Sequence, residues 1–478
     1  MAESIKNTTL NGAFWSFIER FSVQGVQFVI TIIMARLLLP SDYGLIGMLA
    51  IFIGISQIFI DGGFSNALIQ CKNKEEEDFS TVFFINISIS ILIYLILFIS
   101  APYIASFYSQ PILCSITRIY SLNLIINSFG AVNKTKLTIA IDFKTQSKIS
   151  LLSAVISGVV GIICALKGIG VWALVVQALL SSVLNVIFSF IYVKWFPTFV
   201  FSKKSFNKLF SFGSKLLVAQ CISSIYTNLY SAVIGKKFSS TDLGYYTRAC
   251  QFVQLLSTNI SSILSRVSFP VLSKIDDDST LKSIYTKYLK LSCFIMFPLI
   301  LGLCGISKPL ILFLLTDNWI NSVPLLRILC FAYLFDGVIS INLNLLYVKG
   351  RSDLVLRLEL IKKTIAFIIM IVSFFFDLTI VCLGSVLYSI IALYLNTIYT
   401  KKILDEGFIK QVKTFSPYLL LSLLIMIEAL FISDMVSIHW LAILLSLIIC
   451  SVTYFGLSKL FSLYAYNELI SILKEKLK

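Results

Sequence analysis

The chain alternates between long runs of apolar residues and short polar breaks. A helix needs roughly 20 residues to cross a bilayer core about 30 Å thick, and the apolar runs have this length. Because unpaired backbone groups are costly in hydrocarbon, such runs predict transmembrane helices. The pattern predicts fourteen spans, at residues 11–38, 43–63, 79–101, 111–131, 149–166, 171–193, 206–235, 243–265, 288–308, 319–348, 354–376, 379–400, 415–433 and 438–460.

The composition agrees with a protein that lies in lipid. Hydrophobic residues make up 58% of the chain, charged residues make up 13%, and the mean hydropathy is +0.92. A soluble domain carries roughly a quarter of its residues as charged side chains. We therefore predict an all-α integral membrane protein and exclude a soluble enzyme.

The basic residues indicate how the chain is oriented. The formal net charge is +15, and most Lys and Arg residues lie in alternate connections between the predicted spans. Cytoplasmic loops carry this excess of positive charge, so both termini are expected in the cytoplasm. The outer side then carries Arg36, Lys167, Lys236, Lys237 and Lys308. Membrane topology accounts for the basic charge, and we expect no nucleic-acid partner.

The connections leave little room for chemistry. The outer ones are short, and the inner ones lack a phosphate-binding P-loop. The ten cysteines show neither a CxxC pair nor zinc-ligand spacing, and the single histidine, His439, lies in an outer connection. We expect no enzyme activity, no catalytic residue, no metal site and no bound cofactor.

A short motif recurs at an offset of 200 residues. Residues 41–44 read Ser-Asp-Tyr-Gly and residues 241–244 read Thr-Asp-Leu-Gly, each between two long apolar runs. In such a turn the polar side chains cap backbone amides and the glycine permits close packing. The repeat predicts two parallel six-span bundles, at 1–200 and 201–405, followed by two more spans and a cytoplasmic tail at 406–478.

Basic residues inside the predicted spans are candidates for binding an anion. Charges in hydrocarbon are costly unless they face a cavity or a partner, and guanidinium groups suit phosphate. The candidates are Arg20, Arg118, Lys215, Arg248 and Arg327. Two alternatives stay open: Lys215 and Arg248 reach the lipid headgroups, and the three other arginines form ion pairs between neighbouring helices.

Three acidic residues in the spans are candidates for coupling transport to H⁺ or Na⁺, namely Glu19, Asp336 and Glu428. Glu359 precedes Lys362 by three residues, a spacing at which helical side chains meet. We therefore expect a local ion pair there.

Three motifs near the start of the chain carry a family resemblance. They are a turn after the first span (Arg36, Leu37, Leu38, Pro40, Asp42, Tyr43, Gly44), the end of the second span (Asp61, Gly63, Ala67, Leu68, Ile69, Gln70) and the entry to the third span (Glu76, Glu77, Asp78, Ser80, Thr81). In these motifs the chain resembles the Wzx-type (WzxC-like) flippases of the multidrug/oligosaccharidyl-lipid/polysaccharide exporter superfamily.

The resemblance implies a fold and a cargo. Members form a V of two six-helix lobes that open alternately to the two sides of the membrane. The implied activity is transfer of undecaprenyl-diphosphate-linked oligosaccharide units across the bacterial inner membrane for surface polysaccharide assembly. The implied protein is a monomer that contacts membrane lipids and the polysaccharide polymerase machinery. A flippase for the peptidoglycan lipid precursor and a drug/cation antiporter of the same superfamily are the alternatives.

Overall fold

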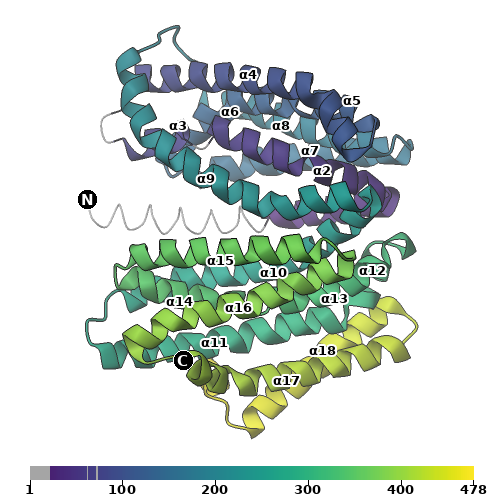
Figure 1. The fold of residues 1–478 in the computed structure, drawn as a ribbon, viewed down its shortest axis with the longest axis vertical. Coiled ribbons are helices and arrows are strands. Elements are labelled where there is room, and N and C mark those ends of the chain that lie inside the picture. Colours follow the sequence, from purple (N-terminus) through teal and green to yellow (C-terminus); the bar gives the residue numbers. More distant parts are fainter. Residues whose placement is uncertain (1–21, 62, 72–73, 478) are drawn as a thin grey trace. The chain divides into compact units, whose positions relative to one another are not determined.

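The computed structural model describes residues 22–61, 63–71 and 74–477, and the described chain consists of helices without a strand (Figure 1). An apolar helix, Ser22–Leu37, comes first. It is followed by α2 (Pro40–Asp61), α3 (Phe64–Gln70), α4 (Glu76–Tyr108), α5 (Ile112–Tyr120), α6 (Leu122–Ile139), α7 (Phe143–Leu166), α8 (Val171–Val193), α9 (Lys203–Lys237), α10 (Ser240–Leu272), α11 (Asp278–Gly305), α12 (Ser307–Leu314), the 3₁₀ turn η1 (Asp317–Trp319), α13 (Ser322–Tyr333), α14 (Asp336–Val348), α15 (Ser352–Ser373), α16 (Leu378–Leu404), α17 (Phe408–Met435), α18 (His439–Leu460) and α19 (Tyr464–Leu477).

Within the described residues, ten helical segments are long and apolar enough to cross a membrane. They are α2 with α3, α4, α5 with α6, α7, α8, α11, α13 with α14, α16, α17 and α18. This result confirms a multi-pass membrane protein. The helix Ser22–Leu37, α9, α10 and α15 are not among the ten, so the predicted number of fourteen stays a prediction.

The chain divides into two compact units, Met1–Gly244 (unit 1) and Tyr245–Lys478 (unit 2). In unit 1, α7 and α6 pack against α8, and α2 packs against α9. In unit 2, α11 packs against α17, α16 contacts α13 and α15, and α17 lies beside α18 (Figure 1). The domain boundaries predicted from the span count stay a prediction.

The repeated motif forms the same structure twice. In each copy a helix ends, and α2 or α10 begins three residues later. The carboxylate of Asp42 accepts a hydrogen bond from the amide of Leu39 at 3.0 Å, and that of Asp242 accepts one from the amide of Ser239 at 3.2 Å. The predicted capping by the motif is therefore confirmed.

The two motif glycines pack against each other's helix starts inside unit 1. A Cβ at Gly44 would lie 1.6 Å from the carbonyl oxygen of Ser240, and a Cβ at Gly244 would lie 1.9 Å from that of Pro40. Glycine is thus required at both positions by close backbone approach. The first turns of α2 and α10 form a reciprocal contact.

The Ser-Thr pair at the start of α4 holds the connection between α8 and α9. The hydroxyls of Ser80 and Thr198 lie 2.9 Å apart, and the amide of Ser202 donates to the Thr81 hydroxyl at 3.0 Å. Both α4 residues are buried. The third motif of the sequence therefore fixes how the chain leaves α8.

Two of the predicted spans, 111–131 and 319–348, contain a break in the helix. The helix that begins at Ile112 breaks at Ser121, and the one that begins at Ser322 breaks at residues 334–335. The second break places Asp336 in the first turn of α14. Hydropathy does not reveal such breaks, because the residues around them are as apolar as a continuous span.

A buried polar network joins four helices of unit 2. The Gln411 side chain on α17 donates to Thr400 on α16 at 3.0 Å and to the Asn342 side chain on α14 at 3.2 Å, and it also donates to the Glu406 carbonyl at 3.0 Å. The hydroxyl of Tyr285 on α11 donates to Asn342. Because each of these polar side chains has a hydrogen-bond partner on another helix, the network fixes how the helices are aligned along one another.

Candidate functional site

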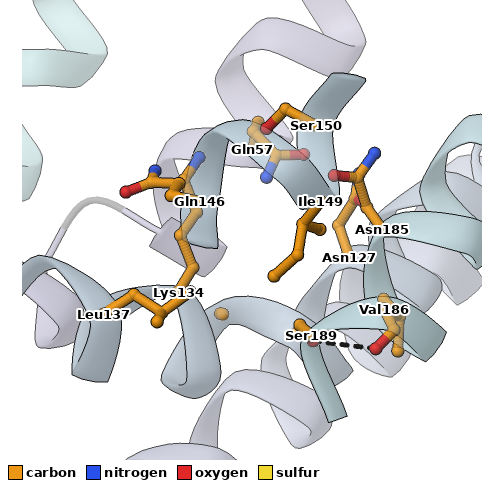
Figure 2. A pocket seen from close by; sticks show the side chains of 12 residues that line it. Gln57, Asn127, Lys134, Leu137, Gln146, Ile149, Ser150, Asn185, Val186 and Ser189 are labelled. Carbon is orange, nitrogen blue, oxygen red and sulfur yellow. Dashed lines mark hydrogen bonds between the residues drawn. The ribbon is translucent and has the colours of Figure 1, made fainter. Parts of the chain in front are cut away.

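A pocket of about 290 Å³ lies in unit 1 between α2, α6, α7 and α8. The lining side chains surround one opening (Figure 2). Those with polar groups are Gln57, Asn127, Lys134, Gln146, Ser150, Asn185 and Ser189. The pocket is the candidate functional site.

The spacing of residues along α6 and α8 creates the pocket wall. Asn127, Gly130 and Lys134 follow one another at three and four residues, and Asn185 and Ser189 are four residues apart. Residues at these spacings share one face of a helix. A Cβ at Gly130 would lie 3.2 Å from a methyl group of Val186, so the glycine permits the close approach of α6 to α8.

The pocket is polar, with a single charge. Lys134 is the one cation that lines it, and no described lining side chain is acidic or aromatic. The Nδ2 group of Asn185 donates to the Ser181 carbonyl at 2.8 Å, whereas the buried Oε1 atom of Gln146 has no hydrogen-bond partner. Carboxamides both donate and accept hydrogen bonds, as sugar hydroxyls do. The pocket suits a hydroxyl-rich ligand that carries one negative charge near Lys134.

A second polar cluster lies in unit 2 around Asp336. Its carboxylate accepts a hydrogen bond from the Ser257 hydroxyl of α10, and the charge of Lys362 on α15 acts on it. Lys362 is 4% exposed and forms an ion pair with Glu359, which confirms the local pair predicted for α15. Asp336 is therefore a half-buried carboxylate with a hydroxyl donor and a cation in its surroundings.

Arg118, a predicted anion-binding residue, lies on α5 in unit 1. Its guanidinium carbon lies 4.4 Å from the centre of the Phe98 ring, and its Nε donates to the Phe98 carbonyl at 3.4 Å. The Phe98 side chain is exposed on the surface of the unit. Arg118 does not line the pocket between α2, α6, α7 and α8.

Arg248 and Arg327 lie in unit 2. Arg248 is 4% exposed, donates to Gln251 at 2.6 Å and stacks over the buried Trp319 ring at 5.4 Å. The Nε of Arg327 donates to the Ser307 hydroxyl at 2.9 Å, which ties α13 to the start of α12. Arg248 is thus held by a residue of its own helix and by the Trp319 ring, and Arg327 is held by a residue of α12. The predicted role of both arginines in anion binding stays a prediction.

Of the remaining predicted residues, Glu428 is the one whose side chain the structure describes. Glu428 lies on α17, where it accepts a hydrogen bond from Thr453 of α18 at 3.0 Å and its second oxygen is buried without a partner. Lys215 lies on α9, and its side chain is outside the described atoms. Glu19 and Arg20 lie outside the described residues.

The pocket of unit 1 could not be predicted from charged residues in the spans. Lys134 lies beyond the predicted end of the fourth span, at residue 131, and was therefore assigned to a connection. The signal that reveals it is a polar stripe at helical spacing, which continues from Asn127 through Lys134 as α6 extends to Ile139.

A protein-family model described as "Polysaccharide biosynthesis protein" matches residues 33–324, which is more than half of the chain. The teichuronic acid biosynthesis protein TuaB of Bacillus subtilis is 29% identical over 73% of this chain and 73% of its own length. The lipopolysaccharide biosynthesis protein WzxC of Escherichia coli is 26% identical over 75% of this chain and 74% of its own length.

Solved structures share the fold at low sequence identity. The lipid II flippase MurJ in an inward closed conformation superposes with a TM-score of 0.77, at 17% identity, over 95% of this chain and 99% of its own. An inward-facing multidrug resistance transporter of the MATE family and MOP superfamily gives a TM-score of 0.59, at 14% identity, over 82% and 99% of the two chains. The fold is that of this group of membrane transporters.

Proposed function

Because the chain belongs to the family of polysaccharide biosynthesis proteins, we propose that it is a flippase for lipid-linked oligosaccharides. The cargo is an undecaprenyl-diphosphate-linked repeat unit, which the protein moves from the cytoplasmic to the periplasmic leaflet of a bacterial inner membrane. The product serves the assembly of O-antigen, capsule or exopolysaccharide.

The pocket of unit 1 is the observation that carries this proposal. A flippase must shelter hydroxyl-rich sugars and a charged diphosphate from hydrocarbon, and neutral amides with one lysine serve both needs. A drug/cation antiporter needs carboxylates or aromatic rings where its cargo binds. The described residues that line this pocket include neither.

The proposed topology has fourteen spans in two six-helix lobes, followed by α17 and α18, with both termini in the cytoplasm. The ten apolar segments, together with the helix Ser22–Leu37, α9, α10 and α15, give this number. Two of the candidate residues, Lys215 and Arg248, lie on α9 and α10, and Lys362, whose charge acts on Asp336, lies on α15. Helices that line a polar passage are expected to be less apolar than helices that face lipid on all sides.

We assign the diphosphate to the basic residues Arg20, Arg118, Lys215, Arg248 and Arg327, with Lys134 added from the pocket. Asp336 is the proposed coupling residue for H⁺ or Na⁺, since the Ser257 hydroxyl and Lys362 surround a carboxylate inside unit 2. Alternating access of the lobes, without a bound cofactor, completes the proposed mechanism. The protein acts as a monomer beside the polymerase machinery.

Deletion of the gene tests the cargo. The expected result is accumulation of a lipid-linked repeat unit on the cytoplasmic leaflet, reversed by the wild-type gene on a plasmid. Accumulation of the peptidoglycan lipid precursor would instead assign the protein to that alternative. Unchanged lipid-linked intermediates together with lost resistance to cationic drugs would contradict a flippase function altogether.

A further inference from the structure

The first three turns of α11 carry a continuous polar stripe. Each member has another member three or four residues away along the helix, so they lie on one face. They are Ser279, Lys282, Ser283, Thr286, Lys287 and Lys290. The opposite face carries Leu281, Tyr285 and Leu289, which are buried in the core of unit 2. The stripe thus faces away from the core.

This stripe forms one wall of a second pocket, of about 370 Å³, and Tyr464 of α19 also lines it. The Nζ atom of Lys290 lies 4.9 Å from the centre of the Tyr464 ring. The α19 helix has 14 residues and packs against α11 and α18. At 1.5 Å per residue it is about 21 Å long, which is too short to cross a bilayer and suits a helix that lies along its surface.

The pocket lies at the level of lipid headgroups. The 28 residues of α11 extend about 42 Å, which exceeds the roughly 30 Å of the hydrocarbon core. Apolar residues predominate from Leu291 onward, so Lys290 marks where the hydrocarbon begins. The three lysines are therefore outside the apolar core, on the side that the charge pattern assigns to the cytoplasm.

The residues that line the pocket carry three positive charges, those of Lys282, Lys287 and Lys290. Glu406 pairs with Lys282 at 3.3 Å, Glu468 pairs with Lys287, and Lys290 contacts the Tyr464 ring. The hydroxyl of Ser279 donates to Asp277 at 2.5 Å. No acidic residue lines the pocket itself within the described chain. Lys282 and Lys287 each have a carboxylate partner, whereas the ammonium group of Lys290 contacts an aromatic ring, so Lys290 is the group that a phosphate is expected to pair with first.

We infer that this pocket between α11 and α19 binds the headgroup phosphate of an anionic glycerophospholipid from the cytoplasmic leaflet. Basic pockets at the cytoplasmic ends of membrane helices attract such headgroups. The bound lipid holds α19 against α11 through Lys287 and Lys290. This site is separate from the pocket of unit 1 and does not depend on which cargo the protein moves.

The full chain, purified in detergent, is examined by native mass spectrometry with added phosphatidylglycerol or phosphatidylcholine. Wild-type protein is expected to retain phosphatidylglycerol in preference to phosphatidylcholine. The double variant Lys287→Gln/Lys290→Gln is expected to weaken this binding by roughly fivefold for each lysine. The matched variant Lys203→Gln/Lys204→Gln removes two exposed lysines at the start of α9 and is expected to bind as the wild type does.

Two further measurements separate lipid binding from damage to α19. Glu468→Gln breaks the ion pair to Lys287 but keeps both lysines, so phosphatidylglycerol binding is expected to persist or strengthen. Equal loss in Glu468→Gln, or equal binding by the two double variants, would overturn the proposal. Glycerol 3-phosphate is added as a soluble competitor. If it displaces the lipid at equal concentration, the site takes soluble phosphate compounds and the lipid assignment is wrong.

Discussion

The reciprocal glycine contact gives the sharpest prediction about the fold. Gly44→Ala would place a methyl group 1.6 Å from the Ser240 carbonyl oxygen. Carbon and carbonyl oxygen normally approach to no less than roughly 3.3 Å. The two helix starts must therefore separate, and the obstacle is backbone that cannot rotate away. Overpacking of this kind typically costs about 1–3 kcal/mol, and a clash this short places Gly44→Ala at the upper end.

Thermal unfolding of the purified protein in detergent measures this cost. The matched control is Gly456→Ala in α18, where a Cβ would meet nothing within 4 Å. Alanine in a helix interior is favoured over glycine by about 0.5–1 kcal/mol, so the control should be neutral or slightly stabilised. Gly244→Ala should destabilise as Gly44→Ala does. Because either change already separates the same two turns, the double variant should cost less than the sum of both. If Gly44→Ala unfolds at the same temperature as Gly456→Ala, the reciprocal contact is refuted.

Three further perturbations have defined outcomes. Gln411→Leu removes the acceptor of the Asn342 NH₂ group, although Tyr285 still donates to the Asn342 oxygen. This change should lower the unfolding free energy by about 1–3 kcal/mol, read from chemical denaturation; an unchanged midpoint would contradict the network. The hydroxyl of Ser279 and the amide of Thr280 lower the pKa of Asp277, which is the N-cap of α11. Its ionised form therefore stabilises the protein fully above about pH 4, and this stabilisation is lost as the pH falls further. The difference in melting temperature between wild type and Asp277→Ala should therefore be smaller at pH 3 than at neutral pH. Asp336→Asn should remove the dependence of flipping on an imposed H⁺ or Na⁺ gradient. Glu428→Gln, at the contact of α17 with α18, should leave that dependence unchanged. If only Glu428→Gln removes the dependence, the coupling role belongs to Glu428.

The positions of the helices could be predicted from hydropathy because the bilayer imposes a length on every span. Each predicted span from residue 79 onward overlaps one α-helix of the structure or two consecutive ones. Some helices extend beyond the apolar runs into polar residues. At α4, for example, Glu75 and Asp78 form a capping box outside the apolar run that begins at residue 79.

The turn chemistry of the repeat was also predictable, because Asp42 and Asp242 cap amides three residues before them in the chain. A contact between residues far apart in the sequence could not be predicted. Neither Gly44 nor Gly244 reveals its partner, since close backbone approach depends on how α2 and α10 pack.

The pocket of unit 1 was not predicted because its residues are uncharged apart from Lys134. Ionisable residues in the spans are the candidates that a sequence points to, since these are the most costly to bury. The structure shows that Asn127, Gln146 and Asn185, which carry no charge, converge on one opening (Figure 2). These residues lie on three different helices, and a single sequence does not reveal that the helices bring them together.

The most direct test of the proposed function is flipping of an undecaprenyl-diphosphate-linked oligosaccharide in proteoliposomes that contain Lys134→Gln. A hydrogen bond to a charged group contributes about 1.5–3 kcal/mol, so the rate should fall roughly 10- to 100-fold. Lys148→Gln is the control, since it removes one exposed lysine of α7 outside the pocket lining and should leave the rate at the wild-type value. Wild-type flipping by Lys134→Gln would contradict the assignment of the cargo to this pocket.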